Sequence, residues 1–173
     1  MTEVDKLIAY IKELNFNPNI DDFQHKLIIQ KAICLLELMN SNLKYPYSLY
    51  VRGPYSPALT KELYNNKEKI EALETKTVLE PAEKAKVEKI REASENLNPT
   101  LLEIMATYAY LTNRLNEDRQ EAMLRLKKLK PFFSEAQIAV GVSRSKILFP
   151  PSQSEVDEMK KEFAAWEELD DLN

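Results

Sequence analysis

The sequence predicts a mostly α-helical fold with one small β element. Its 173 residues include only two glycines, Gly53 and Gly141, and sheet-rich proteins need many tight turns in which glycine is favoured. Apolar residues recur at helical spacing in most of the chain, and capping residues and prolines separate these stretches. Only residues 43–51 alternate as a strand does. We expect one compact helical domain over residues 1–173, with a strand or hairpin around residues 43–53.

The first two helices follow from hydrophobic spacing. Residues 4–14 carry apolar side chains at helical intervals, and the segment 15–19, which contains a proline, ends this helix. Asp21 or Asp22 can cap a second helix that runs to about Asn40. Apolar side chains cover nearly its whole circumference, which is typical of a central, buried helix.

The one strand pattern comes next. Over residues 43–51, apolar or aromatic side chains at every second position alternate with other side chains. Arg52–Tyr55 then interrupt the pattern as a turn. Ser56 and Pro57 then form a typical helix start, because a serine hydroxyl can cap the helix and proline is tolerated at the first helical position. We expect a short helix from there to about Asn65.

Two helices are expected in the middle of the chain. Residues 65–98 are highly charged, and Pro81 begins a helix with little apolar content, which we interpret as a solvated arm or cover. Asn98 and Pro99 repeat the cap-and-proline signal. The strongly apolar stretch 101–111 that follows is the second candidate for a core helix.

Three amphipathic segments complete the chain. Residues 116–129 are followed by Pro131, and Ser134 caps a helix that runs to about residue 148. In the last segment, 154–169, one face carries Val156, Met159, Phe163 and Trp166. This face covers either the core or a second subunit, so the sequence leaves the oligomeric state open.

The composition excludes several classes of protein. Two distant glycines cannot form a nucleotide-binding glycine loop. Cys34 is the only cysteine, which excludes an intramolecular disulfide and a cysteine-rich zinc site. The net charge of −4 gives no global attraction to nucleic acid. Because no stretch reads as a membrane span or a signal peptide, we expect a cytoplasmic protein that does not bind membranes.

No catalytic residue or metal ligand can be assigned. His25 is the only histidine, and the pattern Asp21-Asp22-x-x-His25 is the nearest approach to a metal cluster. At a helix N-terminus aspartates are expected as caps and as partners of the helix dipole, and we favour that interpretation over a metal site. Since no serine or cysteine motif accompanies the histidine, a nucleophilic triad has no support and we expect a protein that is not an enzyme.

Two stretches resemble a known group of proteins. Residues 28–36, IIQKAICLL, are similar to the helix LQKLLYLL of YwgA-like proteins and of the related Panacea (SocA-like antitoxin) domain. Residues 47–59, YSLYVRGPYSPAL, look like that group's aromatic strand and GPYSPxL turn, and the whole resemblance covers about residues 23–148. Cys34 and Arg52 stand where the group usually has aromatic residues. The resemblance implies a helical fold with a small β element, encoded near toxins, phage genes or mobile elements, without a cofactor.

The resemblance also implies a protein-binding module, an antitoxin or adaptor whose partner is a toxin or a client delivered to a protease. Gly53 and Pro54 favour a rigid turn, and exposed tyrosines beside such a turn are suited to contacting a partner protein. Lys31 either lies on a solvent-facing stripe or points toward a polar groove near this turn. The candidate partner-binding residues are Lys31, Tyr50, Arg52, Tyr55 and Ser56, although the turn would also serve simply to join a strand to a helix.

The alternative function is a DNA-binding transcriptional regulator. Residues 134–147, SEAQIAVGVSRSKI, resemble part of a helix-turn-helix with Gly-Val-Ser as the turn, although Gln137 stands where a small residue is usual. A locally basic stretch suited to phosphate contacts includes Arg125, Lys127, Lys128, Lys130, Arg144 and Lys146. The candidate DNA-binding residues are Ser143, Arg144 and Lys146.

Overall fold

The structure, a computed structural model, describes residues 3–171 and confirms a mostly α-helical fold with a small β element. The helices are α1 (Glu3–Glu13), α2 (Phe23–Leu38), α3 (Pro57–Asn65), α4 (Lys67–Glu71), α5 (Pro81–Ala93), α6 (Pro99–Ala109), the π-helix η1 (Tyr110–Arg114), α7 (Arg119–Leu129), α8 (Glu135–Leu148) and α9 (Gln153–Asp171). The strands are β1 (Ser48–Tyr50) and β2 (Gly53–Tyr55). Within residues 3–171 no helix is both long and apolar enough to cross a membrane.

Local signals place most helix starts where the sequence predicts them. The side chains of Asp22, Ser56, Asn98 and Ser134 each accept a hydrogen bond from a backbone N–H in the first turn of α2, α3, α6 and α8. Prolines occupy the first turn of α3, α5 and α6, where no N–H is needed. These signals act over a few residues, which is why they could be read from the sequence.

The β element is shorter than the predicted strand over residues 43–51, and its turn is narrower. β1 and β2 form an antiparallel hairpin with Val51 and Arg52 as its turn, so the predicted turn over residues 52–55 is wrong. Residues 43–47 do not pair with a strand, because Pro46 has no N–H and the N–H of Tyr45 donates to the Glu37 carboxylate at 2.6 Å. Their alternation instead reflects burial of alternate side chains in the main core.

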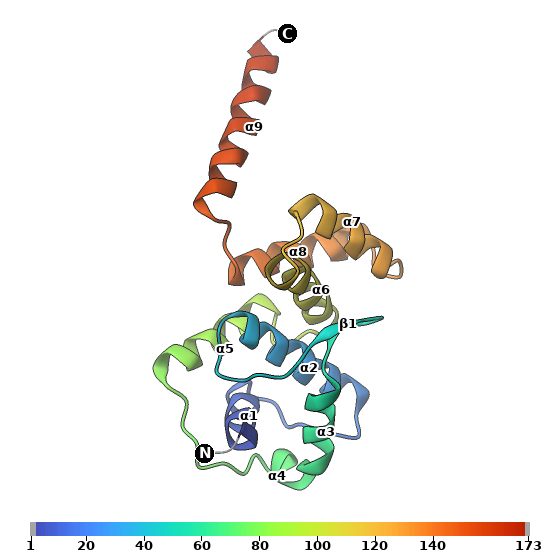
Figure 1. Ribbon diagram of the computed structural model, residues 1–173, viewed down its shortest axis with the longest axis vertical. Helices are drawn as coiled ribbons and strands as arrows, with labels where there is room; N and C mark the ends of the chain where they lie inside the picture. The colour runs from blue at the N-terminus through green and yellow to red at the C-terminus, as the bar shows by residue number, and fades with distance from the viewer. Residues whose placement is uncertain (1–2, 172–173) are drawn as a thin grey trace.

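α6 lies between two hydrophobic clusters. One face of α6 packs into a large cluster with α1, α2, α3 and α5. Its other face, represented by Ile104 and Tyr108, joins a smaller cluster with α7 and α8. Figure 1 shows this order, with α1 to α5 on one side of α6 and α7 and α8 on the other. The prediction that the 101–111 segment is a core helix is therefore confirmed.

Gly141 serves helix packing rather than a helix-turn-helix turn. α8 runs without interruption from Glu135 to Leu148, so the turn expected at Gly141-Val142-Ser143 is not formed. A Cβ added at Gly141 would lie 2.3 Å from Cγ2 of Ile104. The absence of a side chain lets α8 lie directly against α6, and this contact explains the glycine without a turn.

We expect the variant Gly141→Ala to be about 1–3 kcal/mol less stable than the wild type, because the added methyl overpacks the contact with Ile104. In an isolated helix the same change would stabilise by roughly 1 kcal/mol, so the two effects have opposite signs. Urea denaturation measures the difference, and Ser143→Ala on the exposed side of α8 is the matched control with little expected effect. A stabilised Gly141→Ala variant would contradict the close α6–α8 contact.

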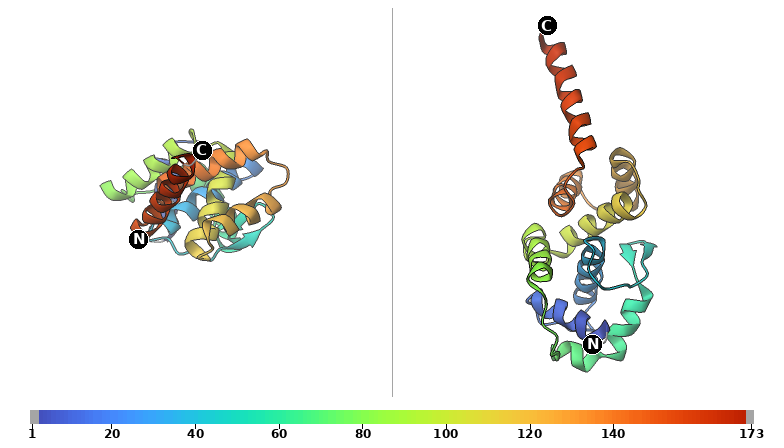
Figure 2. Two further views of the ribbon diagram at one scale, coloured as in Figure 1. Left: turned by 90° about the horizontal axis from the view of Figure 1, so that it is seen from above. Right: turned by 60° about the vertical axis from the view of Figure 1, so that its left-hand side comes forward.

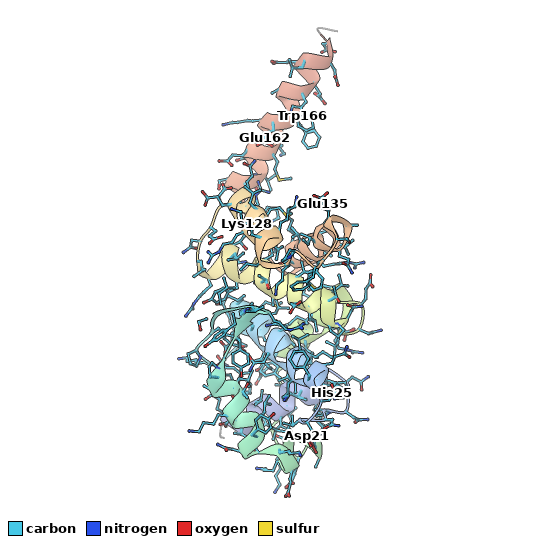
Figure 3. All side chains as sticks on the ribbon, turned by 90° about the vertical axis from the view of Figure 1, so that its right-hand side faces the viewer. Asp21, His25, Lys128, Glu135, Glu162 and Trp166 are labelled. Carbon is cyan, nitrogen blue, oxygen red and sulfur yellow. The ribbon has the colours of Figure 1, made fainter. Side chains whose placement is uncertain are left out.

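The C-terminal helix α9 projects from the body of the molecule (Figures 1 and 2). Its apolar face does not cover the core, because no residue of α9 is buried, and Phe163 and Trp166 are 63% and 67% exposed. Arg119 connects the body to the first turns of α9, at 3.5 Å from both the Met159 sulfur and the Glu155 carboxylate. Figure 3 shows Trp166 far out on this helix.

Candidate functional site

A cleft of about 360 Å³ opens between α2, the β-hairpin and the start of α3. We call it the hairpin cleft. It is lined by Phe23, Lys26, Leu27, Gln30, Lys31, Tyr50, Val51, Arg52, Gly53, Tyr55 and Thr60. Figure 2 (right) shows the hairpin beside α2 and next to α3. The cleft is therefore formed by α2 on one side and by the continuous segment of hairpin and α3 on the other. Such a volume lies at the lower end of the range typical of ligand pockets.

Gln30 holds the far end of the hairpin against α2. Its side-chain amide accepts from the N–H of Ser56 at 3.1 Å and donates to the carbonyl of Ser56 at 2.9 Å. The same amide nitrogen donates to the Thr60 hydroxyl at 2.9 Å. Gln30 therefore satisfies both backbone groups of the residue that caps α3, and it fixes one wall of the cleft relative to another.

Lys31 lies at the floor of the cleft and is only 2% exposed. Its Nζ donates to the carbonyl oxygen of Pro54 at 2.8 Å. Burial lowers the pKa of the Lys31 ammonium to about 8, and the nearby cations Lys130 and Arg52 also act in this direction. Of the two positions that the sequence left open for Lys31, the structure shows the one beside the hairpin.

Gly53 brings the hairpin into direct contact with α6. Its φ of +95° is a backbone conformation that residues with a side chain rarely adopt. A Cβ built there would lie 2.3 Å from Oγ1 of Thr107 and 3.6 Å from Nζ of Lys31. A glycine is therefore required for two reasons: the backbone angle disfavours other residues, and there is no room for a side chain between the hairpin and α6.

A buried ionic cluster lies beneath the hairpin turn. Glu103 of α6 is 2% exposed, and its Oε1 lies 3.5 Å from Nζ of Lys130, which is fully buried. Lys130 also donates to the carbonyl of Val51 at 2.9 Å, and Arg52 approaches Glu103 to 3.9 Å. Burial lowers the pKa of Lys130, and the carboxylate of Glu103 opposes that shift. In the sequence, Lys130 belongs to a basic stretch suited to phosphate contacts. The structure instead buries Lys130, which supports the hairpin.

Aromatic side chains form the exposed rim of the cleft. The rings of Tyr50 and Tyr55 meet edge to face with centroids 5.2 Å apart, and the Tyr55 hydroxyl shares a hydrogen bond of 2.6 Å with Thr60. The guanidinium of Arg52 lies 5.1 Å from the ring centre of Phe23. Tyr50 and Phe23 remain 48% and 57% exposed. The rim therefore presents aromatic surface next to cations, a combination that is common at protein interfaces.

The structure brings four of the five predicted partner-binding residues together. Lys31, Tyr50, Arg52 and Tyr55 line the hairpin cleft. Ser56 is fully buried beneath it, where its hydroxyl caps α3 through the N–H of Leu59 at 3.3 Å. Its contacts are those of a structural residue.

Sequence reasoning missed several contributors to this site, three of which shape its rim and its support. They are Phe23 on the rim and Glu103 and Lys130 under the turn. Phe23 stands out in the sequence as an aromatic residue next to a helix cap. Glu103 and Lys130 lie far from the hairpin in the chain, and no local pattern indicates that they meet it.

The predicted DNA-binding residues lie on the second half of α8. Ser143 and Lys146 are exposed, whereas Arg144 is half-buried and forms an ion pair with Glu95 at 3.2 Å. Because α8 is continuous, these side chains do not belong to a helix-turn-helix with its turn at Gly141.

Of the two aspartates near His25, Asp22 caps α2. Asp22 accepts from the N–H of His25 at 3.0 Å, and Nδ1 of His25 accepts from the N–H of Asn19 at 2.8 Å. Asp21 forms an ion pair with Lys67 at 2.6 Å. Figure 3 shows Asp21 and His25 together at the end of the body opposite α9. These contacts agree with the capping interpretation, and residues 3–171 contain no group of three or more side chains arranged to hold a metal ion.

Comparisons of the chain with protein-family models, with curated proteins and with solved structures return no match. The similarity to YwgA-like and Panacea proteins therefore stays a prediction from the motifs around Lys31 and Gly53.

Proposed function

We propose that the protein is a non-catalytic protein-binding module and that the hairpin cleft receives a segment of its partner. The observation that carries this proposal is the exposed lining of the cleft, in which Phe23, Tyr50 and Val51 offer apolar surface beside Arg52. Tyrosine, phenylalanine and arginine are enriched where proteins bind one another, whereas scattered single apolar residues need no explanation. Here they come from α2 and the hairpin and face one hollow.

The cleft is held in one shape by buried contacts. Gln30 fixes the start of α3, Lys31 fixes the Pro54 carbonyl, and Gly53 packs on α6. A surface whose backbone is already ordered loses less conformational entropy when a partner binds. The buried part of the motif thus supports binding by the exposed part, which reconciles the structural and functional interpretations of the turn.

The class of partner follows from the sequence resemblance and remains part of the proposal. An antitoxin or adaptor of the YwgA-like or Panacea type would bind a toxin or a client for a protease in the cytoplasm. We place the contact at Tyr50, Arg52 and Tyr55, with Lys31 below them. The DNA-binding alternative enters the experiment below as a competing outcome.

The experiment is site-specific photocrosslinking in the native cell. The photoreactive amino acid p-benzoyl-phenylalanine is placed at Val51, on the rim of the cleft, or at Val78, which is the matched control because both side chains are 78% exposed. We expect a discrete protein adduct at Val51 but not at Val78, and we expect Tyr50→Ala or Phe23→Ala to reduce its yield by about tenfold, since aromatic anchors dominate interface energies.

Two outcomes would overturn the proposal. Equal labelling at Val51 and Val78 would mean that the cleft has no specific protein partner. An adduct that nuclease removes, together with DNA binding that Arg144→Glu abolishes, would favour the regulator instead.

A further inference from the structure

The charges beneath the hairpin turn do not balance. The cations Lys31, Lys130 and Arg52 share a single carboxylate, that of Glu103, so this cluster carries an excess of two positive charges. The excess is local, because the chain as a whole has a net charge of −4. Buried cations without matching anions are costly.

Lys31 is the cation with the least compensation. Glu103 lies within 4 Å of Lys130 and Arg52, whereas Lys31 has no ion pair within that distance among residues 3–171. An ammonium group has three N–H donors, and the Pro54 carbonyl is the one acceptor that Lys31 reaches in this part of the chain. Lys31 also lines the hairpin cleft, and its other two N–H donors have no acceptor among residues 3–171.

Arg52 carries positive charge from the buried cluster to the exposed rim of the cleft. Its side chain is 57% exposed, and its guanidinium lies between Glu103 below and the ring of Phe23 beside it. An anion at the floor of the cleft would approach Lys31 and Arg52 together. The surrounding lining from Phe23, Leu27 and Tyr55 is apolar or aromatic, which suits an anion carried next to an apolar side chain.

We propose that Lys31 and Arg52 bind an aspartate or glutamate side chain of the partner segment, while an aromatic or aliphatic neighbour of that carboxylate fills the apolar part of the hairpin cleft. This inference rests on the proposed function and specifies the chemistry of the partner. A carboxylate supplies acceptors for the free Lys31 donors and cancels part of the positive excess. Such charge-assisted hydrogen bonds are about twice as strong as neutral ones.

Carboxylate binding should depend on pH. Burial lowers the pKa of free Lys31 to about 8, so Lys31 is charged at pH 7 and loses its proton above pH 8. The groups that face it are Cys34 from α2, Glu103 from α6, Arg52 from the turn and Lys130; burial raises the pKa of Cys34, so that thiol stays neutral. Because the carboxylate requires the charged amine, affinity should fall by at least about fivefold between pH 7 and pH 9.5.

The test uses small capped probes and NMR titration of the full chain, following the methyl signals of Leu27 and Val51. The probes are N-acetyl-Phe-Glu-amide, its neutral counterpart N-acetyl-Phe-Gln-amide, and N-acetyl-phenylalanine, which carries a terminal carboxylate. We expect the glutamate probe to bind about tenfold more tightly than the glutamine probe at pH 7, as a charge-assisted contact requires. Tighter binding of N-acetyl-phenylalanine than of the glutamate probe would overturn the assignment to a side-chain carboxylate.

Variants assign the preference to the two cations. Lys31→Met should abolish the preference for glutamate and flatten its pH dependence, and Arg52→Gln, which changes an exposed side chain, should weaken the preference without affecting folding. Lys128→Met on the exposed surface of α7 is the control, and this variant should keep the full preference for the glutamate probe. Retention of the full preference in both cleft variants would overturn the proposal.

Failure of this inference can be told apart from failure of the proposed function. A Val51 adduct together with equal binding of the glutamate and glutamine probes would keep the protein-binding module and reject the carboxylate. A clear glutamate preference without any protein adduct would keep the anion site and reject a protein partner.

Discussion

Replacing Gln30 with leucine is expected to lower the free energy of unfolding by about 1–3 kcal/mol, because it leaves the buried N–H of Ser56 without a partner. Leucine has nearly the same size but cannot hydrogen-bond to the N–H and carbonyl of Ser56, which is fully buried. The carbonyl of Ser56 keeps the N–H of Thr60 as a donor at 3.2 Å, so the N–H of Ser56 is the group left unsatisfied, at a cost of about 1–3 kcal/mol. Urea denaturation followed by circular dichroism measures the change.

The matched control is Gln24→Leu, at an exposed position in the first turn of the same helix. We expect it to change stability by less than about 0.5 kcal/mol. A loss below about 1 kcal/mol for Gln30→Leu would mean that Ser56 finds other partners and that Gln30 does not hold the hairpin.

Replacing Glu103 with glutamine is expected to destabilise the protein by about 3–5 kcal/mol, because breaking a buried ion pair leaves an uncompensated charge. Lys130 is fully buried, and Glu103 is its carboxylate partner at 3.5 Å. The variant would also leave Lys31 and Arg52 without the one carboxylate in their cluster. Urea denaturation at pH 7 measures the change.

A double variant separates the loss of a charge from the loss of packing. Glu103→Met combined with Lys130→Met removes both charges and should recover most of the stability, because apolar residues often replace a buried pair without cost. Glu88→Gln breaks the exposed pair between Glu88 and Arg91 and should cost less than about 1 kcal/mol. If the double variant were less stable than Glu103→Gln, the charges would stabilise the fold directly.

Much of the fold could be read from the sequence because its causes are local. Helix caps at Asp22, Ser56, Asn98 and Ser134 act within one turn, and each is found where it was predicted. The two core helices also follow from their apolar circumference, since a helix without a polar face must be buried. The predicted strand was too long because burial of alternate side chains gives the same pattern with or without a paired strand.

The hairpin cleft could be predicted only in part. Lys31, Tyr50, Arg52 and Tyr55 drew attention through a helix motif and a turn motif close together in the chain, and the structure places all four around one hollow. Phe23 was not assigned to it, because nothing local shows which way an aromatic side chain at a helix start will face.

The sequence by itself determined the helical class, most helix starts and the hairpin segment that forms part of the rim of the cleft, because spacing and capping depend on neighbours in the chain. Only the tertiary structure decided that Gly141 marks a helix contact, and that Lys130 lies buried under the hairpin with Glu103. A glycine fits a turn or a close contact equally well, and a lysine in a charged stretch looks solvated until a distant carboxylate is found beside it. Which distant residues meet depends on how the helices pack, and local spacing does not encode that choice.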